Sequence, residues 1–371
     1  MSVKSIPALI SSGDRLDGVD ALRGIAALYV FVYHLALIPQ PALSVPGWAG
    51  KYILTGGTGV SLFFVVSAFC LCLSMRLHGQ EPSITVRFYV RRIFRIVPLF
   101  YFWIVVSLLR DRYWLGVTHS PSEVLLSVVF GFNFVPGINE GFVWASWTLG
   151  VEMLFYLLFP LIFFYFNNWW KSLLFYFCTL PIALLYPFLI GYLPIAQSMR
   201  ESYARTSLLS QLPIFAFGMV IFFVFERFVK DKSRQSVWAY ALVGAAVFAY
   251  DSLISGRVYP FLGVFSLQGV IYGVLLLGLA VAPLRLIVNS VTRFYGEISY
   301  SFYLTHPTLV ALLVPVYRAI YSTHLSVTLQ YGACLLLTLS CVTAISFLTF
   351  RFVERPGMRM GRRIIKQIGS R

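Results

Sequence analysis

Long runs of apolar residues recur along the chain and constrain its fold more than any other feature. Ten runs stand at residues 21–39, 57–75, 93–109, 144–166, 171–191, 208–226, 236–252, 261–282, 298–317 and 328–350. Each is close to the roughly 20 residues that an α-helix needs to cross a bilayer. Only 12% of the 371 residues are charged, about half the share of a soluble domain. We therefore expect an all-α, polytopic membrane bundle of about ten transmembrane helices.

The spacing of these runs leaves no room for a second domain. No polar stretch between them exceeds the length of a loop. Residues 1–371 are therefore predicted to form one transmembrane domain, with short tails at 1–20 and 354–371. The stretch 121–135 is too short to span a bilayer, and it either lies at the membrane surface or re-enters.

The net charge of +15 raises the question of a nucleic-acid partner. Basic residues of nucleic-acid binders cluster on one folded face, whereas here they lie between apolar runs. Most of the 29 lysines and arginines fall in the two tails and the even-numbered loops. That asymmetry predicts both termini in the cytoplasm, in a multi-pass protein of the inner membrane that contacts lipids and binds no nucleic acid.

Titratable residues within the apolar runs are costly at membrane depth, so each is a functional hypothesis. Arg23 and His34 are eleven residues apart, which leaves only about 20° between them on a helix and separates them by roughly 16 Å. They therefore share one helix face. The alternatives are that Arg23 only fixes topology and that His34 only packs between helices.

A cluster of arginines opens the third run. Arg92 and Arg95 are i,i+3 neighbours, and Arg91 and Arg95 are i,i+4 neighbours, so the cations gather on one side of a helix. Such a cluster at the cytoplasmic end suits a polyphosphate or another anion. An interfacial anchor is the simpler alternative.

Two further titratable residues fall at a depth similar to that of His34. Glu152 lies five residues after Trp147, and His306 lies deep in the ninth run. A buried carboxylate needs a partner, and the imidazole of His34 is a sensible one, although an arginine would also serve. His306 either assists proton transfer or bonds the backbone that Pro307 frees.

The remaining histidines give no comparable signal. His78, His119 and His324 fall in loops, where we expect solvated surface side chains. No spacing of cysteine or histidine predicts a metal site. A zinc site built from His34, His306 and Glu152 is possible in type, but nothing in their spacing favours it.

Six short motifs occur in order along almost the whole chain. They stand at residues 17–28 (followed by His34), 59–67, 91–98, 147–152, 298–306 and 353–356. Together they resemble DGLRGIAAL…H, GVxLFFVLSG, RRxxRIxP, WSLxVE, ISYSxYLxH and VERP of the acyltransferase-3 family. Its members are membrane O-acyltransferases of O-antigen, exopolysaccharide, nodulation-factor and macrolide acylation.

The resemblance implies that an acyl group, most simply acetyl, moves from cytoplasmic acyl-CoA to a hydroxyl of a saccharide or glycosylated acceptor on the other side. Acetyl-CoA would be a co-substrate, with no permanently bound cofactor. The roles carried over are donor-binding for Arg23, Arg92 and Arg95, with His34 at the reacting centre. Glu152 and His306 are predicted as further catalytic residues, and Trp147 and Tyr303 as substrate-binding residues. A polysaccharide-biosynthesis partner or a second copy of the chain stays open as a further partner.

A sugar hydroxyl is a poor nucleophile and needs a base within hydrogen-bond reach. We expect His34, oriented by Glu152, to remove its proton as it attacks the thioester. Transient acylation of His34 fits the same residues. A non-catalytic transporter or flippase for a saccharide or acyl group is the competing class, and a scaffold subunit of an export machine is a third.

Overall fold

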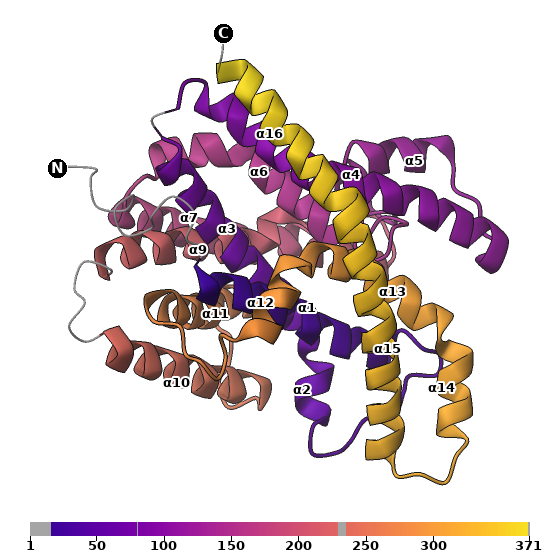
Figure 1. The fold of residues 1–371 in the computed structure, drawn as a ribbon. Coiled ribbons are helices and arrows are strands. Elements are labelled where there is room, and N and C mark those ends of the chain that lie inside the picture. Colours follow the sequence, from indigo (N-terminus) through magenta and orange to yellow (C-terminus); the bar gives the residue numbers. More distant parts are fainter. Residues whose placement is uncertain (1–15, 80, 229–234, 370–371) are drawn as a thin grey trace. The chain divides into compact units, whose positions relative to one another are not determined.

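The computed structural model describes residues 16–79, 81–228 and 235–369, which form helices joined by loops, with no strand among them. Figure 1 traces these helices in chain order. Nine helices within the described ranges are long and apolar enough to cross a membrane, by length and composition. The prediction of an all-α, polytopic membrane protein is confirmed.

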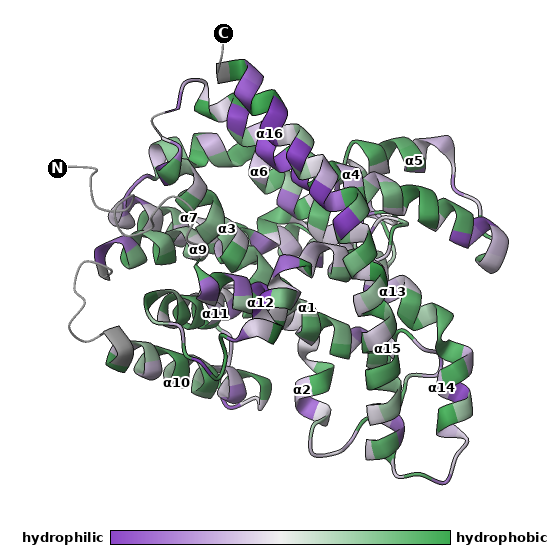
Figure 2. Cartoon of the chain, in the orientation of Figure 1, coloured by the Kyte–Doolittle hydropathy of each residue, from purple (hydrophilic) through white to green (hydrophobic). Residues whose placement is uncertain are grey.

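The outward surface of the helices is apolar, as lipid contact requires. In α6 (Trp147–Tyr165), Leu157, Leu161 and Phe164 are 62%, 60% and 71% exposed. They are spaced i, i+4 and i+7, so they form one apolar stripe on the outside of the helix. Figure 2 shows hydrophobic residues along α10 and α11 and a row of hydrophilic residues on α16.

The ninth predicted span, 298–317, is broken in the structure. It forms α13 (Ser299–Leu312) and α14 (Val314–Tyr321), which meet at Leu313. Pro315 lies in the first turn of α14, and a proline has no N–H to continue the preceding helix. The chain therefore starts a new helix there, and the prediction of one continuous span was wrong.

The chain divides into two compact units. The first contains residues up to 25, then 60–89 and 151–296. Its elements are the start of α1 (Asp17–Leu37), α3 (Gly59–Leu77), α6, α7 (Trp169–Ile190), α8 (Gln197–Arg205), α9 (Leu208–Phe228), α10 (Gln235–Ile254), α11 (Val264–Val281) and α12 (Ser290–Glu297).

Aromatic stacking forms the core of this first unit. The ring of Phe215 stacks on Phe64 and on Phe155, with centroids 4.6 and 4.2 Å apart. Gly24 lies where α1 meets α12, and a Cβ there would lie 2.2 Å from the carbonyl oxygen of Thr292. Only glycine permits that approach, which gives the glycine after Arg23 a packing role.

The second unit contains residues 26–59, 90–150 and 297–371. Its elements are the rest of α1, α2 (Gly50–Leu54), η1 (Gly56–Thr58), α4 (Ile84–Arg110) from residue 90, η2 (Asp111–Leu115), α5 (Pro121–Val128), η3 (Phe132–Phe134), α13, α14, α15 (Val327–Thr349), η4 (Phe350–Glu354) and α16 (Arg355–Gly369). The stretch 121–135 thus holds only short helices, as predicted.

Helix α13 contacts both α1 and α4 within this unit. The hydroxyl of Tyr300 donates to the carbonyl oxygen of Ile96 in α4 at 2.8 Å. On another side, the ring of Phe302 packs edge-on against Phe31 of α1, with centroids 5.5 Å apart. These contacts fix α13, which carries His306, against the helix that carries His34.

The two predicted tails differ in what the structure describes. Residues 1–15 of the tail 1–20 lie outside the described residues, and residues 17–20 already belong to α1. At the other end, α15, η4 and α16 follow one another without a break as helix. The single-domain interpretation of the chain stays a prediction.

Candidate active site

The predicted catalytic residues His34 and His306 are in direct contact. The Nδ1 atom of His34 lies 2.8 Å from Nε2 of His306, and the two rings stack with centroids 5.0 Å apart. His306 is fully buried and His34 partly buried. The two residues are 272 positions apart in sequence, so only the packing of α13 on α1 brings them together.

A backbone carbonyl determines which ring nitrogens carry protons in the neutral pair. The Nδ1 atom of His306 lies 3.3 Å from the carbonyl oxygen of Phe302. A carbonyl only accepts, so Nδ1 of His306 is the N–H and its Nε2 is an acceptor. Nδ1–H of His34 then donates to that Nε2. The unprotonated nitrogen of His34 is therefore Nε2, which is free to accept a proton.

Tyr303, predicted to bind substrate, lies beside this pair. Its ring meets that of His306 edge-on, with centroids 5.6 Å apart, and its hydroxyl accepts from Thr148 Oγ1 at 3.1 Å. Trp147, the second predicted substrate residue, begins α6, and its carbonyl oxygen accepts from Asn133 at 3.3 Å. The turn 147–148 is thus fixed next to α13.

The glycine of the same motif is required by close packing. A Cβ at Gly150 would lie 1.4 Å from Oδ1 of Asn133. The side chain of Asn133 also donates to the carbonyl oxygen of Asn139 at 3.1 Å. Asn133 therefore links the loop before α6 to the first turn of that helix, and a side chain at position 150 would displace the amide of Asn133.

Glu152 belongs to the first unit and has hydroxyl partners there. Its Oε1 accepts from Ser67 at 2.5 Å and from the hydroxyl of Tyr156. Sequence reasoning missed both partners, although Tyr156 follows Glu152 by one helical turn and Ser67 ends a quoted motif. The pairing of Glu152 with His34 stays a prediction.

The predicted donor-binding arginines are half-buried. Arg23 lies on α1, eleven residues before His34, and Arg92 and Arg95 lie one turn apart on α4. Half-burial leaves a guanidinium accessible while its stem packs on apolar neighbours. A cation in this position is able to bind phosphate, and the assignment of these three residues to acyl-CoA stays a prediction.

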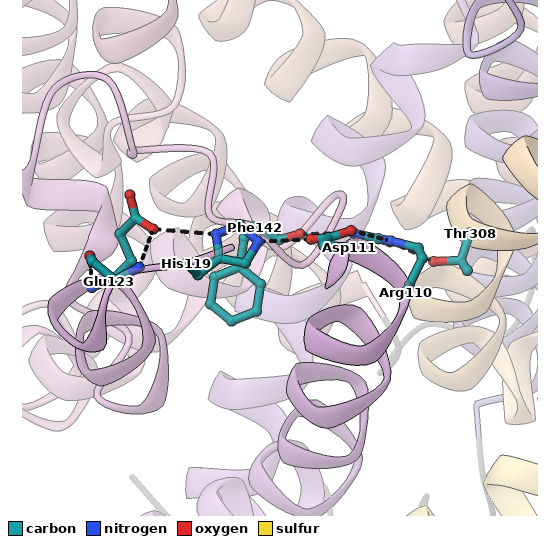
Figure 3. Close-up of polar contacts among 7 residues, drawn as sticks. Arg110, Asp111, His119, Glu123, Phe142 and Thr308 are labelled. Atoms are coloured by element: carbon teal, nitrogen blue, oxygen red, sulfur yellow. Dashed lines mark hydrogen bonds and ion pairs between the residues drawn. The ribbon is translucent and has the colours of Figure 1, made fainter. Parts of the chain in front are cut away.

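A buried polar network that the sequence did not reveal lies at the far end of α4. Arg110 is 8% and Asp111 3% exposed. Nε of Arg110 donates to Asp111 Oδ1 at 2.6 Å, and another guanidinium nitrogen donates to Thr308 Oγ1 at 2.9 Å. The guanidinium also lies over the ring of Trp144, 4.1 Å from its centroid. Figure 3 shows Arg110 between Asp111 and Thr308.

His119 extends this network and corrects the expectation of a solvated side chain. It lies in a loop, as predicted, but its Nε2 is 2.8 Å from Asp111 Oδ2 and its Nδ1 is 3.3 Å from Glu123 Oε2. Its ring stacks on Phe142 at 4.4 Å (Figure 3). The adjacent Arg110 and Asp111, at the end of an apolar run, were the available signal, because a polar pair there needs a partner.

The other two loop histidines behave as ordinary surface residues. His324 is exposed and His78 is half-buried, with Nδ1 2.9 Å from the carbonyl oxygen of Ser74. Over the described ranges, no group of three or more His, Cys, Asp or Glu side chains is arranged to hold a metal ion. The groups found at the His34–His306 pair are those of acid–base chemistry.

Comparison with known proteins agrees with the motifs. Over 334 residues the chain is 26% identical to the exopolysaccharide production protein ExoZ of Rhizobium meliloti, covering 84% of this chain and 93% of that one. It is also 26% identical to BcsY of Komagataeibacter xylinus, whose name ascribes membrane-bound transacylase activity to it, over 93% of this chain and 83% of that one.

A shorter match is to the acyltransferase MdmB of Streptomyces mycarofaciens, 35% identical over 40% of this chain and 39% of that one. No solved structure gives a significant match. The family model described as an acyltransferase domain matches residues 16–347. The chain is therefore a multi-pass membrane protein that belongs to the acyltransferase-3 family.

Proposed function

We propose that this protein transfers an acyl group, most simply acetyl, from acyl-CoA to a hydroxyl of a saccharide or glycosylated acceptor. The observation that carries the proposal is the hydrogen bond between His34 and His306, because it leaves Nε2 of His34 as an unprotonated base. The family match supports acyl transfer. The name of ExoZ, an exopolysaccharide production protein, supports a saccharide acceptor.

The positions of the protons on the two imidazole rings determine the proposed reaction steps. Nε2 of His34 removes the hydroxyl proton as the oxygen attacks the thioester carbonyl. The tetrahedral intermediate collapses to the ester, and the departing CoA thiolate takes the proton back from Nε2 of His34. His306 accepts from Nδ1–H throughout and stabilises the imidazolium, as a carboxylate does in hydrolase triads. Atoms and protons then balance, and no other base is required.

A covalent route uses the same residues. Nε2 of His34 would attack the thioester and form an acyl-imidazole, which the hydroxyl would then open. Acetylated enzyme formed from acetyl-CoA in the absence of acceptor would favour this route. Its absence from a rapidly quenched reaction of active protein would favour direct transfer.

The donor end of the site is assigned to Arg23, Arg92 and Arg95. Guanidinium groups bind phosphate through paired N–H donors, which ammonium groups do not match. Replacing Arg92 or Arg95 with Lys should therefore raise the KM for acetyl-CoA about tenfold and leave acceptor KM unchanged. Normal CoA dependence in both variants would refute the donor assignment.

The two substrates are proposed to arrive from opposite sides of the inner membrane. Basic residues concentrate in the tails and even-numbered loops, which favours cytoplasmic termini. Arg23 would then lie near the cytoplasm, with His34 roughly 16 Å deeper along α1. Cysteine labelling from outside intact cells, at introduced loop positions on each side, tests this orientation.

Glu152 is retained as a proposed catalytic residue. Two hydroxyls fix its carboxylate, which is the arrangement expected for a group with a defined direction rather than a solvated charge. In Glu152→Gln the amide keeps the shape and removes the charge. Wild-type kcat in that variant would remove Glu152 from the mechanism.

The decisive experiment is acyl transfer in membranes with labelled acetyl-CoA and extracted glycans as acceptor. Wild type should label glycan, and His34→Ala should label it about 1000-fold more slowly at equal abundance. His324→Ala, which removes an exposed histidine, is the matched control and should match wild type. Equal labelling by wild type and His34→Ala would remove His34 from the mechanism, and no thioester consumption by wild type would favour a transporter.

A further inference from the structure

A cavity of about 180 Å³ opens between the loop after α1 and helix α14. The loop 39–44 forms one wall, and Tyr317, Arg318 and Tyr321 contribute to the other. The loop follows directly on the helix that carries His34, and α14 follows directly on the helix that carries His306. The two helices of the histidine pair therefore each continue into one wall of this cavity.

The cavity begins just past the end of the helix that carries His34. Pro39 follows His34 by five residues, and α1 ends at Leu37. The N–H of Leu43 donates to the carbonyl oxygen of Ala36 at 2.9 Å, so the loop folds back over the last turn of the helix. The cavity wall is therefore held against the end of the helix that carries His34.

Hydrogen bonds between the walls preform the cavity. The guanidinium of Arg318 donates to the carbonyl oxygen of Gln40 at 3.0 Å, and the hydroxyl of Tyr321 donates to that of Ser44 at 2.6 Å. Tyr317 is fully buried, and its hydroxyl lies 2.6 Å from Thr338 Oγ1 of α15. A preformed site binds its ligand without losing loop entropy.

The lining combines flat apolar faces with a few polar groups. Pro41 and the ring of Tyr321, which are exposed and half-buried, offer surfaces on which the C–H face of a sugar ring packs. Arg318 has five N–H donors, of which one is used on Gln40, and the side chain of Gln40 is exposed. Apolar walls with a small number of placed polar groups are typical of small-molecule sites.

We propose that this cavity binds the sugar residue adjacent to the one that is acylated. The inference rests on the proposed function, because it identifies the acceptor as an oligosaccharide rather than a single sugar. An acyl chain would need no guanidinium in the wall, and a free phosphate would need no flat apolar faces. A sugar needs both, and its neighbour in the chain would then reach Nε2 of His34.

The test uses acceptor pieces of increasing length. Extracted glycans are partially hydrolysed to a ladder from single sugars upward, and labelling from acetyl-CoA is measured for each length. Wild type should acylate two-sugar pieces about 10-fold more efficiently, in kcat/KM, than single sugars. Gln40→Ala and Arg318→Gln should reduce that ratio to about 2-fold or less, with KM for acetyl-CoA unchanged.

Two exposed residues outside the cavity supply matched controls. Arg112→Gln and Gln367→Ala remove the same chemical groups from η2 and α16, and both should keep the wild-type ratio. If Gln40→Ala and Arg318→Gln keep the same preference for two-sugar pieces as the controls, the cavity is not the sugar site. The proposed acyltransferase function would be unaffected by that result. No labelling of any glycan by wild type would overturn the proposed function and this inference with it.

Discussion

The second unit holds two histidine sites that are built from opposite kinds of partner. In the His34–His306 pair, the partners are another imidazole and the carbonyl oxygen of Phe302. His119 instead lies between the carboxylates of Asp111 and Glu123. Both sites touch α13, the first through His306 and the second through the bond from Arg110 to Thr308.

The partners decide what each imidazole is able to do. Both ring nitrogens of His119 lie against a carboxylate oxygen, so neither is left facing a substrate. His119 therefore serves to link Asp111 to Glu123. In the imidazole pair, hydrogen bonds occupy three of the four ring nitrogens. The fourth, Nε2 of His34, is left as a base.

The largest effect that bears on this comparison is expected at His306. His306→Leu removes the acceptor for Nδ1–H of His34 and should lower kcat about 100-fold, with KM for acetyl-CoA unchanged. His306→Gln can place an amide oxygen where Nε2 was, so it should recover most of that loss. The kcat of each variant is measured from steady-state rates at saturating substrate. Equal kcat in the two variants would show that catalysis does not depend on a hydrogen-bond acceptor for Nδ1–H of His34.

The next effect concerns stability. Asp111 accepts from Arg110 at 2.6 Å and lies 2.8 Å from Nε2 of His119. Asp111→Asn would leave the buried guanidinium of Arg110 without its anion, which should cost about 3 to 5 kcal/mol of unfolding free energy and lower the melting temperature in detergent. We expect acyl transfer per folded molecule to fall about 10-fold at most, because the histidine pair itself is untouched.

A surface ion pair provides the control for that variant. Arg257 donates to Asp251 at 3.4 Å, and its side chain is 63% exposed. Asp251→Asn should change the unfolding free energy by less than about 1 kcal/mol, because solvent screens an exposed pair. Equal melting temperatures for the two variants would mean that the Arg110–Asp111–His119 network is as solvated as the surface pair.

Sequence patterns predicted the parts of the fold that depend on local chemistry. Nine of the ten predicted runs correspond to helices that are long and apolar enough to cross a membrane in the described part of the chain, because hydrocarbon thickness sets their length. The break at Leu313 was not visible from Pro315 alone, because Pro98, Pro160 and Pro307 lie inside unbroken helices. His34 and His306 were identified singly, as titratable groups at membrane depth.

Which side chains contact one another was not predicted from the sequence patterns. His34 and His306 meet only because α13 packs on α1, and no spacing within either helix predicts which nitrogen faces which. His119 was assigned to solvent because its loop is polar, yet its partners Asp111 and Glu123 lie eight residues before it and four after it. The deciding information is tertiary for the histidine pair, whereas the partners of His119 are local and were overlooked.

The smallest effect tests whether the two histidine sites are connected. Thr308 lies two residues after His306 and accepts from Arg110 at 2.9 Å. Thr308→Val keeps the shape and removes the hydroxyl, so the helical turn that carries His306 loses its hydrogen bond from Arg110. We expect kcat to fall about threefold with acetyl-CoA KM unchanged, and Thr308→Ser, which keeps the hydroxyl, to restore it. A fall of the same size in both would assign the effect to packing, and no fall in either would show that the network stabilises the fold without positioning His306.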